Sequence, residues 1–126
     1  MYTVLVIDDE TGLLRLLQMV LERAGYRALV ASNGIEGVNM IYEFQPDVIV
    51  LDEILPDVSG SDICLKLKAD PQVAHIPVII HSGGAKVFNQ AHLTRIGAIA
   101  GLPKPSTVPA ILNTVEGCLR AKDKSA

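Results

Sequence analysis

Short apolar segments alternate with longer amphipathic ones along this chain, and the alternation decides its fold class. Five short segments rich in Val, Ile, Leu or Ala predict β-strands at residues 2–7, 27–31, 48–51, 78–81 and 98–102. Longer segments with apolar residues at helical spacing separate them. Strands that alternate with helices in this way predict a parallel sheet with helices packed against both of its faces.

The intervening segments predict five helices. The first is the clearest, because its apolar residues gather on one side of a helical wheel and its polar residues on the other. Thr11 is expected to cap its start and Gly25 to end it. The other helices are expected over residues 34–43, 61–68 and 85–96, and after Ser106 and Thr107. In the last of these, Pro109 falls in the first turn, where its missing N–H costs nothing.

The length of 126 residues allows one domain. Five βα units without internal repeats match either a five-stranded doubly wound sheet or part of a larger Rossmann fold. The length favours the first, an α/β flavodoxin-like sheet of strand order 2-1-3-4-5 with five helices. We expect residues 1–121 to form the domain and residues 122–126 to form a polar C-terminal tail.

Charge and hydropathy exclude several classes of function. Eleven Lys and Arg against 14 Asp and Glu give a net charge of −3, so direct nucleic-acid binding has little electrostatic support. The chain has neither an apolar run long enough to cross a membrane nor the features of a signal peptide, so we expect it in the cytoplasm. Cys64 and Cys118 lack CxxC partners, which predicts small buried hydrophobic residues instead of a zinc site or disulfide.

Polar side chains follow four of the five expected strands. Asp8 and Asp9 follow the first strand, Asp52 the third, Ser82 the fourth and Lys104 the fifth. The carboxyl ends of parallel strands meet at one edge of a sheet, so these groups are expected to lie together. Crowded carboxylates repel one another unless a cation lies among them, and hard oxygen ligands suit Mg²⁺.

A simpler interpretation treats the first two of these acids, with Glu10, as the start of a helix whose N-terminal dipole favours negative charge. That interpretation leaves Asp52 unexplained. A carboxylate that directly ends an apolar strand carries a desolvation cost unless it is paired or bound to a metal. The combination therefore favours a site.

With these residues in place, the chain resembles the receiver domains of two-component response regulators, of the stand-alone chemotaxis-regulator type. The matching motifs occur in family order across nearly the whole chain: residues 6–9, 46–52, Pro56, Gly60, 79–83, 97–98 and 104–105. The resemblance implies that Asp52 accepts a phosphoryl group from a histidine kinase or a histidine phosphotransfer protein. It also implies that Ser82 and Lys104 hold the phosphoryl oxygens.

The resemblance further implies an Mg²⁺ ion held by Asp8, Asp9, Asp52 and the backbone carbonyl of Ile54. It implies intrinsic autophosphorylation and autodephosphorylation without turnover of a separate substrate. A homodimer through the fourth helix, fifth strand and fifth helix is also expected. No motif indicates which output partner or effector domain receives the signal.

Four positions depart from the family pattern. Gly101 lies three residues before Lys104, where the family commonly has an aromatic residue whose ring turns inward on phosphorylation. We therefore expect the signal to leave by backbone movement. Glu53 stands where an apolar residue is more common, Ile54 replaces a polar side chain, and Pro103 stiffens the segment before the lysine.

Two other classes of function compete with the phosphoacceptor switch. A receiver-like module that binds partners without phosphorylation would fit the missing aromatic residue but not the intact set of charged groups. A small enzyme on the same fold would need a phosphate-binding loop, a second aspartyl motif or a glycine fingerprint after the first strand, and the chain has none of these there. His81 precedes Ser82 and faces the other side of its strand, so we expect a packed or surface histidine and not a catalytic one.

Overall fold

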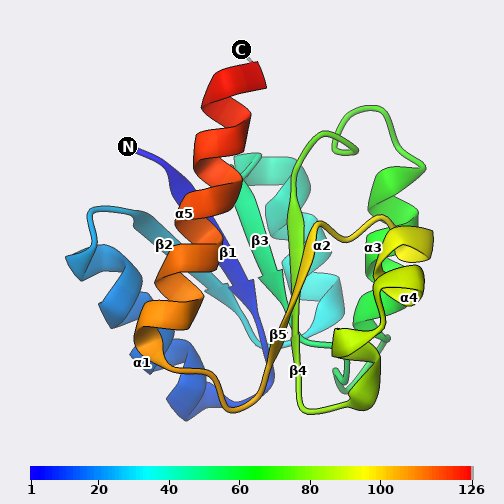
Figure 1. Ribbon diagram of the computed structural model, residues 1–126, viewed down its shortest axis with the longest axis horizontal. Coiled ribbons are helices and arrows are strands. Elements are labelled where there is room, and N and C mark those ends of the chain that lie inside the picture. Colours follow the sequence, from blue (N-terminus) through cyan, green and yellow to red (C-terminus); the bar gives the residue numbers. More distant parts are fainter. Residues whose placement is uncertain (126) are drawn as a thin grey trace.

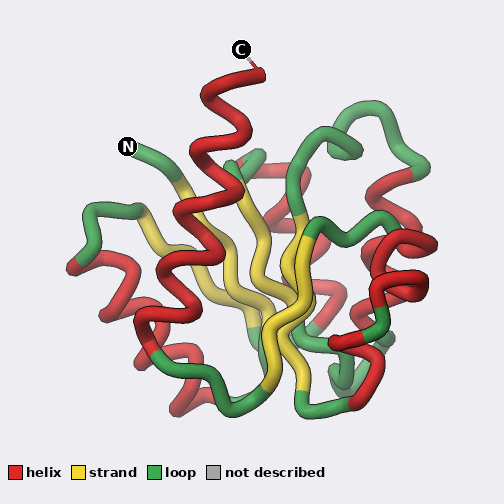
Figure 2. The backbone as a smooth tube through the Cα atoms, in the orientation of Figure 1, coloured by secondary structure: helices red, strands yellow, loops and turns green. Residues whose placement is uncertain are grey.

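The computed structural model describes residues 1–125, which form one parallel sheet of five strands with helices on both sides (Figures 1 and 2). The strands lie in the order β2-β1-β3-β4-β5, as predicted. The strands are β1 (Thr3–Ile7), β2 (Arg27–Ala31), β3 (Val48–Leu51), β4 (Val78–Ser82) and β5 (Ala100–Pro103). The helices are α1 (Thr11–Arg23), α2 (Gly34–Phe44), α3 (Gly60–Lys68), the short 3-10 helix η1 (Ala85–Phe88), α4 (Gln90–Ile96) and α5 (Val108–Ser125).

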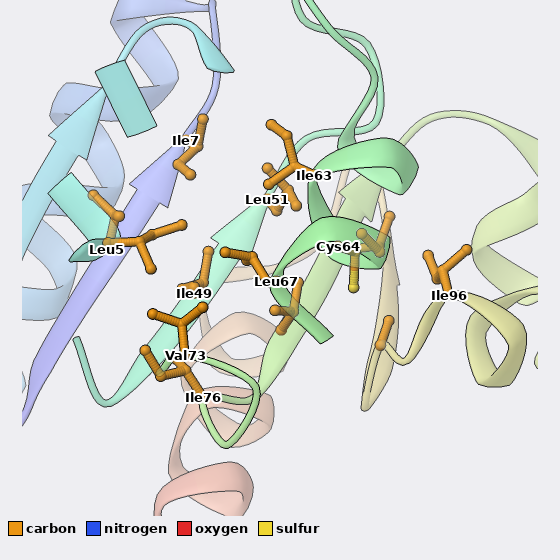
Figure 3. Close-up of a cluster of buried hydrophobic side chains, with 14 of the residues drawn as sticks. Leu5, Ile7, Ile49, Leu51, Ile63, Cys64, Leu67, Val73, Ile76 and Ile96 are labelled. Carbon is orange, nitrogen blue, oxygen red and sulfur yellow. The ribbon is translucent and has the colours of Figure 1, made fainter. Parts of the chain in front are cut away.

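Alternating side chains of the strands divide the core into two layers. On one face, Ile49 and Leu51 of β3 pack with buried residues of α2, α3 and α4 (Figure 3). On the other, Val48 and Val50 pack with buried residues of α1 and α5. Because both faces are covered, all four residues of β3 are buried, which explains its unbroken apolar sequence.

Both cysteines pack as predicted. Cys64 on α3 lies in the first core layer and Cys118 on α5 in the second, and each is a free, buried thiol. Burial raises the pKa of the Cys64 thiol to about 11, so it remains protonated at neutral pH.

The predicted fourth helix over residues 85–96 is wrong as a single element. Asn89 adopts an extended backbone (φ −89°, ψ 100°) that separates η1 from α4. Its side chain then accepts a hydrogen bond from the backbone N–H of His92 at 3.0 Å, which satisfies one of the free donors at the start of α4. The interruption is therefore a helix N-cap inside the segment.

The bounds of β5 also differ from the prediction. Gly97 ends α4 with a left-handed backbone (φ 83°), and the N–H of Ala98 donates to the carbonyl of Leu93 at 2.9 Å. Ala98 is thus part of the helix C-terminus, so β5 begins at Ala100 instead. At α1 the N-cap position is Glu10 and not Thr11, and it makes no side-chain capping bond.

Helix α5 continues through residues 122–125, which we expected to form a polar tail, while residue 126 lies outside the described residues. Lys122 pairs with the carboxylate of Asp47 at 2.7 Å. The other oxygen of Asp47 accepts from the N–H of Thr3 at 2.7 Å, and the hydroxyl of Tyr2 donates to Asp123. These contacts fasten the end of α5 to the amino ends of β1 and β3.

The loop between β3 and α3 also holds the start of α2. Both oxygens of Asp57 accept backbone hydrogen bonds from α2, at 2.8 Å from the N–H of Gly34 and 2.8 Å from that of Ile35. Asn33 caps the same helix by accepting from the N–H of Glu36 at 2.9 Å. These bonds lower the pKa of Asp57, which remains charged beside the positive end of the helix dipole.

Candidate functional site

The carboxyl edge of the sheet brings together the two acids that end central strands. The N–H of Asp8 donates to the carbonyl of Ala31 at 3.0 Å, and that of Asp52 donates to the carbonyl of Ile7 at 2.9 Å. Both residues thus continue the parallel ladders one step beyond β1 and β3. Both are almost fully buried, with 1% and 6% of their surfaces exposed.

Lys104 supplies the positive charge between these two carboxylates. Its Nζ lies 2.6 Å from Asp8 Oδ2 and 3.3 Å from Asp52 Oδ2, and Glu10 Oε1 is more distant at 3.9 Å. The N–H of Lys104 donates to the carbonyl of Ser82 at 3.0 Å, which sets the start of the loop after β5. The peptide bond that follows, to Pro105, is cis.

The pKa values at this edge follow from burial and from the crowding of charge. Burial, and then the neighbouring charge of Asp8, raise the pKa of Asp52, while Lys104 opposes the increase. Burial alone would lower the pKa of Lys104, but its hydrogen bond to Asp8 and the charges of both carboxylates raise it above the ordinary value. Lys104 therefore stays cationic at neutral pH.

Asp9 completes a cluster of three carboxylates. Asp9 is exposed, and one oxygen each of Asp8, Asp9 and Asp52 lie within 4.8 Å of one another. Oxygen ligands of one Mg²⁺ ion, bound at about 2.1 Å, lie about 3–4 Å apart, so small side-chain adjustments bring the three oxygens into range. This set of hard oxygen donors fits a divalent cation such as Mg²⁺, as the sequence predicts.

Ser82 and Ile54 lie beside the carboxylates. The hydroxyl of Ser82 accepts from the N–H of Gly84 at 3.1 Å, which folds the loop after β4. The N–H of Ile54 points to Asp52 Oδ1 at 3.4 Å, while Ile54 as a residue is 73% exposed. The sequence-predicted residues all lie at this carboxyl edge: Ser82 is the last residue of β4, and Asp8, Asp9, Asp52, Ile54 and Lys104 follow strands.

His81 is buried on the opposite face of β4 from Ile80, toward α1 and α5. This agrees with the expectation of a packed histidine. Burial, and then the charge of Lys104, lower the pKa of His81 and favour the neutral ring. Among the described residues, its Nε2 has no hydrogen-bond partner.

Sequence reasoning missed a set of polar contacts beside the site. Glu53, noted only as a departure from the family pattern, bonds Ser61 of α3, which also contacts His92 of α4. Ser61 and His92 lie 31 positions apart, and neither belongs to a motif. Of these residues, only Glu53 could have been noticed in the sequence, because it is a charged residue that follows an apolar strand.

Comparisons with known proteins agree with this geometry. The family model described as "Response regulator receiver domain" matches residues 4–116. The polar-differentiation response regulator DivK of Brucella anthropi is 31% identical over 117 residues, which are 93% of this chain and 95% of that protein. The DNA-binding dual master transcriptional regulator RpaA of Synechocystis is 35% identical over 96% of this chain, which spans 50% of that protein.

Solved structures give the same result. A receiver domain from Clostridium thermocellum is 30% identical with a TM-score of 0.90 and covers 100% of both chains. A CheY-like receiver domain from Methanospirillum hungatei has a TM-score of 0.92 at 25% identity and covers 100% of this chain and 99% of that one.

The fold and the acidic edge define a phosphoacceptor signalling domain. The chain belongs to the response-regulator receiver family of two-component systems. Membership implies a histidine kinase as a partner. In the described part of the chain, no helix combines the length and apolar character needed to cross a membrane.

Proposed function

We propose that Asp52 is the phosphoacceptor of this receiver domain. The observation that carries the proposal is the position of the Lys104 ammonium, 3.3 Å from Asp52 and 2.6 Å from Asp8. A fixed cation beside a buried carboxylate offsets the negative charge that a phosphoryl group adds. A cavity lined by Glu53 and Ile54, which come directly after Asp52 in the sequence, and by Ser82 and Gly84 at the same sheet edge supports the choice of Asp52.

The reaction is a displacement at phosphorus. One carboxylate oxygen of Asp52 attacks, and the bond between phosphorus and the donor's histidine nitrogen breaks. The imidazole nitrogen leaves with the electron pair and takes up a proton. Phosphoryl transfer of this kind depends mainly on alignment and charge neutralisation, which the residues around Asp52 are placed to supply.

We assign Asp8, Asp9, Asp52 and the backbone carbonyl of Ile54 as the residues that hold Mg²⁺. When bound, the ion neutralises charge on the phosphoryl oxygens. The carboxylates of Asp8 and Asp9 attract and position it, and Asp8 also keeps Lys104 oriented. The Ser82 hydroxyl and the Lys104 ammonium are assigned to the remaining phosphoryl oxygens, one as a neutral donor and one as a positive charge.

The same residues support autophosphorylation from small phosphodonors and slow autodephosphorylation. In autodephosphorylation, a water oxygen attacks phosphorus, the bond to Asp52 breaks, and the water loses a proton as inorganic phosphate leaves. Either reaction changes the state of this protein and not of a separate substrate. We therefore propose a switch with intrinsic chemistry and not a turnover enzyme.

The donor is proposed to be either the kinase itself or a histidine phosphotransfer protein. Kinases of this type draw on cytoplasmic ATP, so we place the reaction in the cytoplasm. We propose the surface of α4, β5 and α5 as the face for homodimerisation. Light scattering with and without beryllofluoride, a phosphoryl mimic, tests whether such a dimer forms.

Incubation with acetyl phosphate and Mg²⁺ followed by intact-mass measurement tests the assignment of Asp52. The native protein should gain a labile mass of about 80 Da, whereas Asp52→Asn should gain none. The amide is nearly isosteric, so Asp52→Asn should stay folded. Incorporation by this variant at the native rate would place the acceptor elsewhere. Absence of incorporation by the native protein would favour a module that binds without phosphorylation, which the glycine at position 101 also fits.

A further inference from the structure

A chain of hydrogen bonds begins at the residue next to Asp52 and ends on α4. Ser61 Oγ lies 2.6 Å from Glu53 Oε2 and 3.2 Å from His92 Nε2. On the other side of the imidazole, a terminal guanidinium nitrogen of Arg95 lies 2.9 Å from His92 Nδ1. The chain thus joins the β3–α3 loop, α3 and α4. We call it the Glu53–Arg95 chain.

The chemistry of its two ends fixes the direction of every bond. A guanidinium only donates, so Nδ1 of His92 accepts from Arg95. A carboxylate only accepts, so the Ser61 hydroxyl donates to Glu53. Ser61 has one hydrogen, so His92 must donate to it from Nε2. The four groups therefore have one consistent arrangement, with a positive charge on α4 and a negative charge beside the phosphoacceptor.

The loop end of the Glu53–Arg95 chain is tightly held. The N–H of Gly60 donates to the carbonyl of Glu53 at 2.8 Å. A Cβ at Gly60 would overlap the backbone carbonyl of Asp52, so α3 begins directly against the phosphoacceptor's own backbone. The loop at Glu53 is therefore in direct backbone contact with the start of α3, where Ser61 is the next residue after Gly60.

The rotation of an aromatic ring on β5, which the family resemblance implies, cannot carry a signal to α4 in this protein. Gly101 has no ring to turn, and a Cβ there would overlap the carbonyl oxygen of Val87. Val87 of η1 is buried and occupies the space beside Gly101. In contrast, a cavity of about 430 Å³ lined by Glu53, Ile54, Ser82 and His92, among others, leaves room for the Glu53–Arg95 chain to rearrange.

We propose that the Glu53–Arg95 chain couples the state of Asp52 to helix α4, with Ser61 and His92 as positioning residues. The inference rests on the proposed phosphorylation of Asp52. A phosphoryl group on Asp52 displaces the contact between its carboxylate and the N–H of Ile54, which shifts the loop that carries Glu53. The hydrogen bond from Ser61 then changes, and His92 moves with it. Coupling is reciprocal, so α4 in turn sets the affinity of the site.

Amide hydrogen exchange with and without Mg²⁺ and beryllofluoride measures this coupling. In the native protein, the mimic should slow exchange both at the site, over residues 82–84, and in α4, over residues 90–96. In Ser61→Ala the response at residues 82–84 should persist while that of α4 falls to less than roughly a third of the native response. Ser61→Thr keeps the hydroxyl and should restore it.

Two further variants separate coupling from loss of structure. Glu53→Gln keeps the shape of the side chain but weakens the acceptor, and it should reduce the α4 response as Ser61→Ala does. Thr94→Ala removes an exposed hydroxyl of α4 whose bond is to Gln90 on the same helix, and it should leave the response native. By reciprocity, Ser61→Ala should also change the beryllofluoride affinity by roughly threefold to tenfold.

The outcomes distinguish this inference from the proposed function. A full α4 response in both Ser61→Ala and Glu53→Gln would overturn the coupling and leave the assignment of Asp52 intact. Equal loss of response in Thr94→Ala would overturn it as well, because the effect would then belong to α4 in general. A native protein that shows no response at residues 82–84 would overturn the proposed function and this inference together.

Discussion

The carbonyl oxygen of Val87 lies where the side chain of residue 101 would otherwise be, so η1 and β5 touch through backbone at Gly101. The contact leaves no room for a side chain three positions before Lys104. The strand and η1 pack together in place of a ring, and Val87 fills the gap with its own side chain.

Gly101→Ala should therefore destabilise the fold. The added Cβ overlaps backbone atoms of η1, which move only at a cost, and we expect the free energy of unfolding to fall by roughly 1–3 kcal/mol. Urea unfolding measures the change. Gly117→Ala is a suitable control, since Gly117 lies on α5 with no neighbouring atom within 4 Å of the added carbon. This control should stabilise the helix by about 0.5–1 kcal/mol. Equal stability of Gly101→Ala and the native protein would show that the contact is loose.

Asp9→Ala should weaken Mg²⁺ binding without harming the fold. Asp9 is the exposed member of the three carboxylates, so its loss removes a proposed metal ligand but no buried contact. We expect the Mg²⁺ dissociation constant to rise by about tenfold or more, because one of the three proposed carboxylate ligands is lost. Isothermal titration with Mg²⁺ measures the constant, and thermal unfolding in chelator serves as the control. Unchanged Mg²⁺ affinity would rule out Asp9 as a ligand.

Ile54→Asn should shorten the lifetime of the phosphorylated protein. The side chain of Ile54 is exposed beside the site, and neither it nor Gly84 has a side-chain group that orients an attacking water. An amide at position 54 supplies such a group, so we expect dephosphorylation to accelerate by roughly threefold to tenfold.

Decay of the phosphorylated protein in buffer with Mg²⁺, followed by intact mass, gives that lifetime. Ile35→Asn makes the same change at an exposed position on α2 and should leave the lifetime native. A lifetime that stays equal or lengthens in Ile54→Asn would refute the role given to water alignment.

Asp47→Asn should reduce stability at neutral pH. Burial alone would raise the pKa of Asp47, but bonds from Lys122 and from the N–H of Thr3 outweigh burial and lower it. Because the pKa is lower in the folded state, the charged carboxylate stabilises the fold at pH values above its unfolded-state pKa, near 4. This contribution is lost as the pH falls through the lower folded-state pKa. We expect a loss of about 1 kcal/mol at pH 7, measured by urea unfolding.

The difference in the free energy of unfolding between Asp47→Asn and the native protein should become smaller as the pH falls from 6 toward 3. Lys122→Met tests the same pair from its other side and should show the same trend. A difference that stays constant with pH would mean that the contribution of Asp47 does not depend on its charge.

The sequence predicts most of this fold because its central strands are buried on both faces. The ranges predicted for β2 and β3 agree with the structure, since each is a run of mainly apolar residues between turn-forming ones. The acids after β1 and β3 were placed correctly for a related reason. In a parallel sheet, position along each strand is enough to assign residues to one edge.

Other features depend on contacts that local patterns do not contain. The separation of η1 from α4 follows from the backbone of Asn89 and its bond to His92, within the segment of the chain whose helical periodicity is the weakest. The end of α5 is polar and has no apolar stripe that would predict a helix. Lys122 nevertheless donates a hydrogen bond to the carboxylate of Asp47, which lies 75 positions earlier in the sequence. The link between Ser61 and His92 is similarly nonlocal.

The contacts of Asp57 constrain the number of residues in the β3–α3 loop. The start of α3 presses Gly60 against the backbone of Asp52, and three residues earlier Asp57 caps α2. An extra residue between Asp52 and Gly60 would pull at least one of these two ends out of place. Insertions within residues 69–77, the α3–β4 loop, avoid both attachments. The number of residues from Asp52 to Gly60 thus determines how α2 and α3 are positioned against the sheet. Substitutions can change this loop without moving the two helices, whereas insertions cannot.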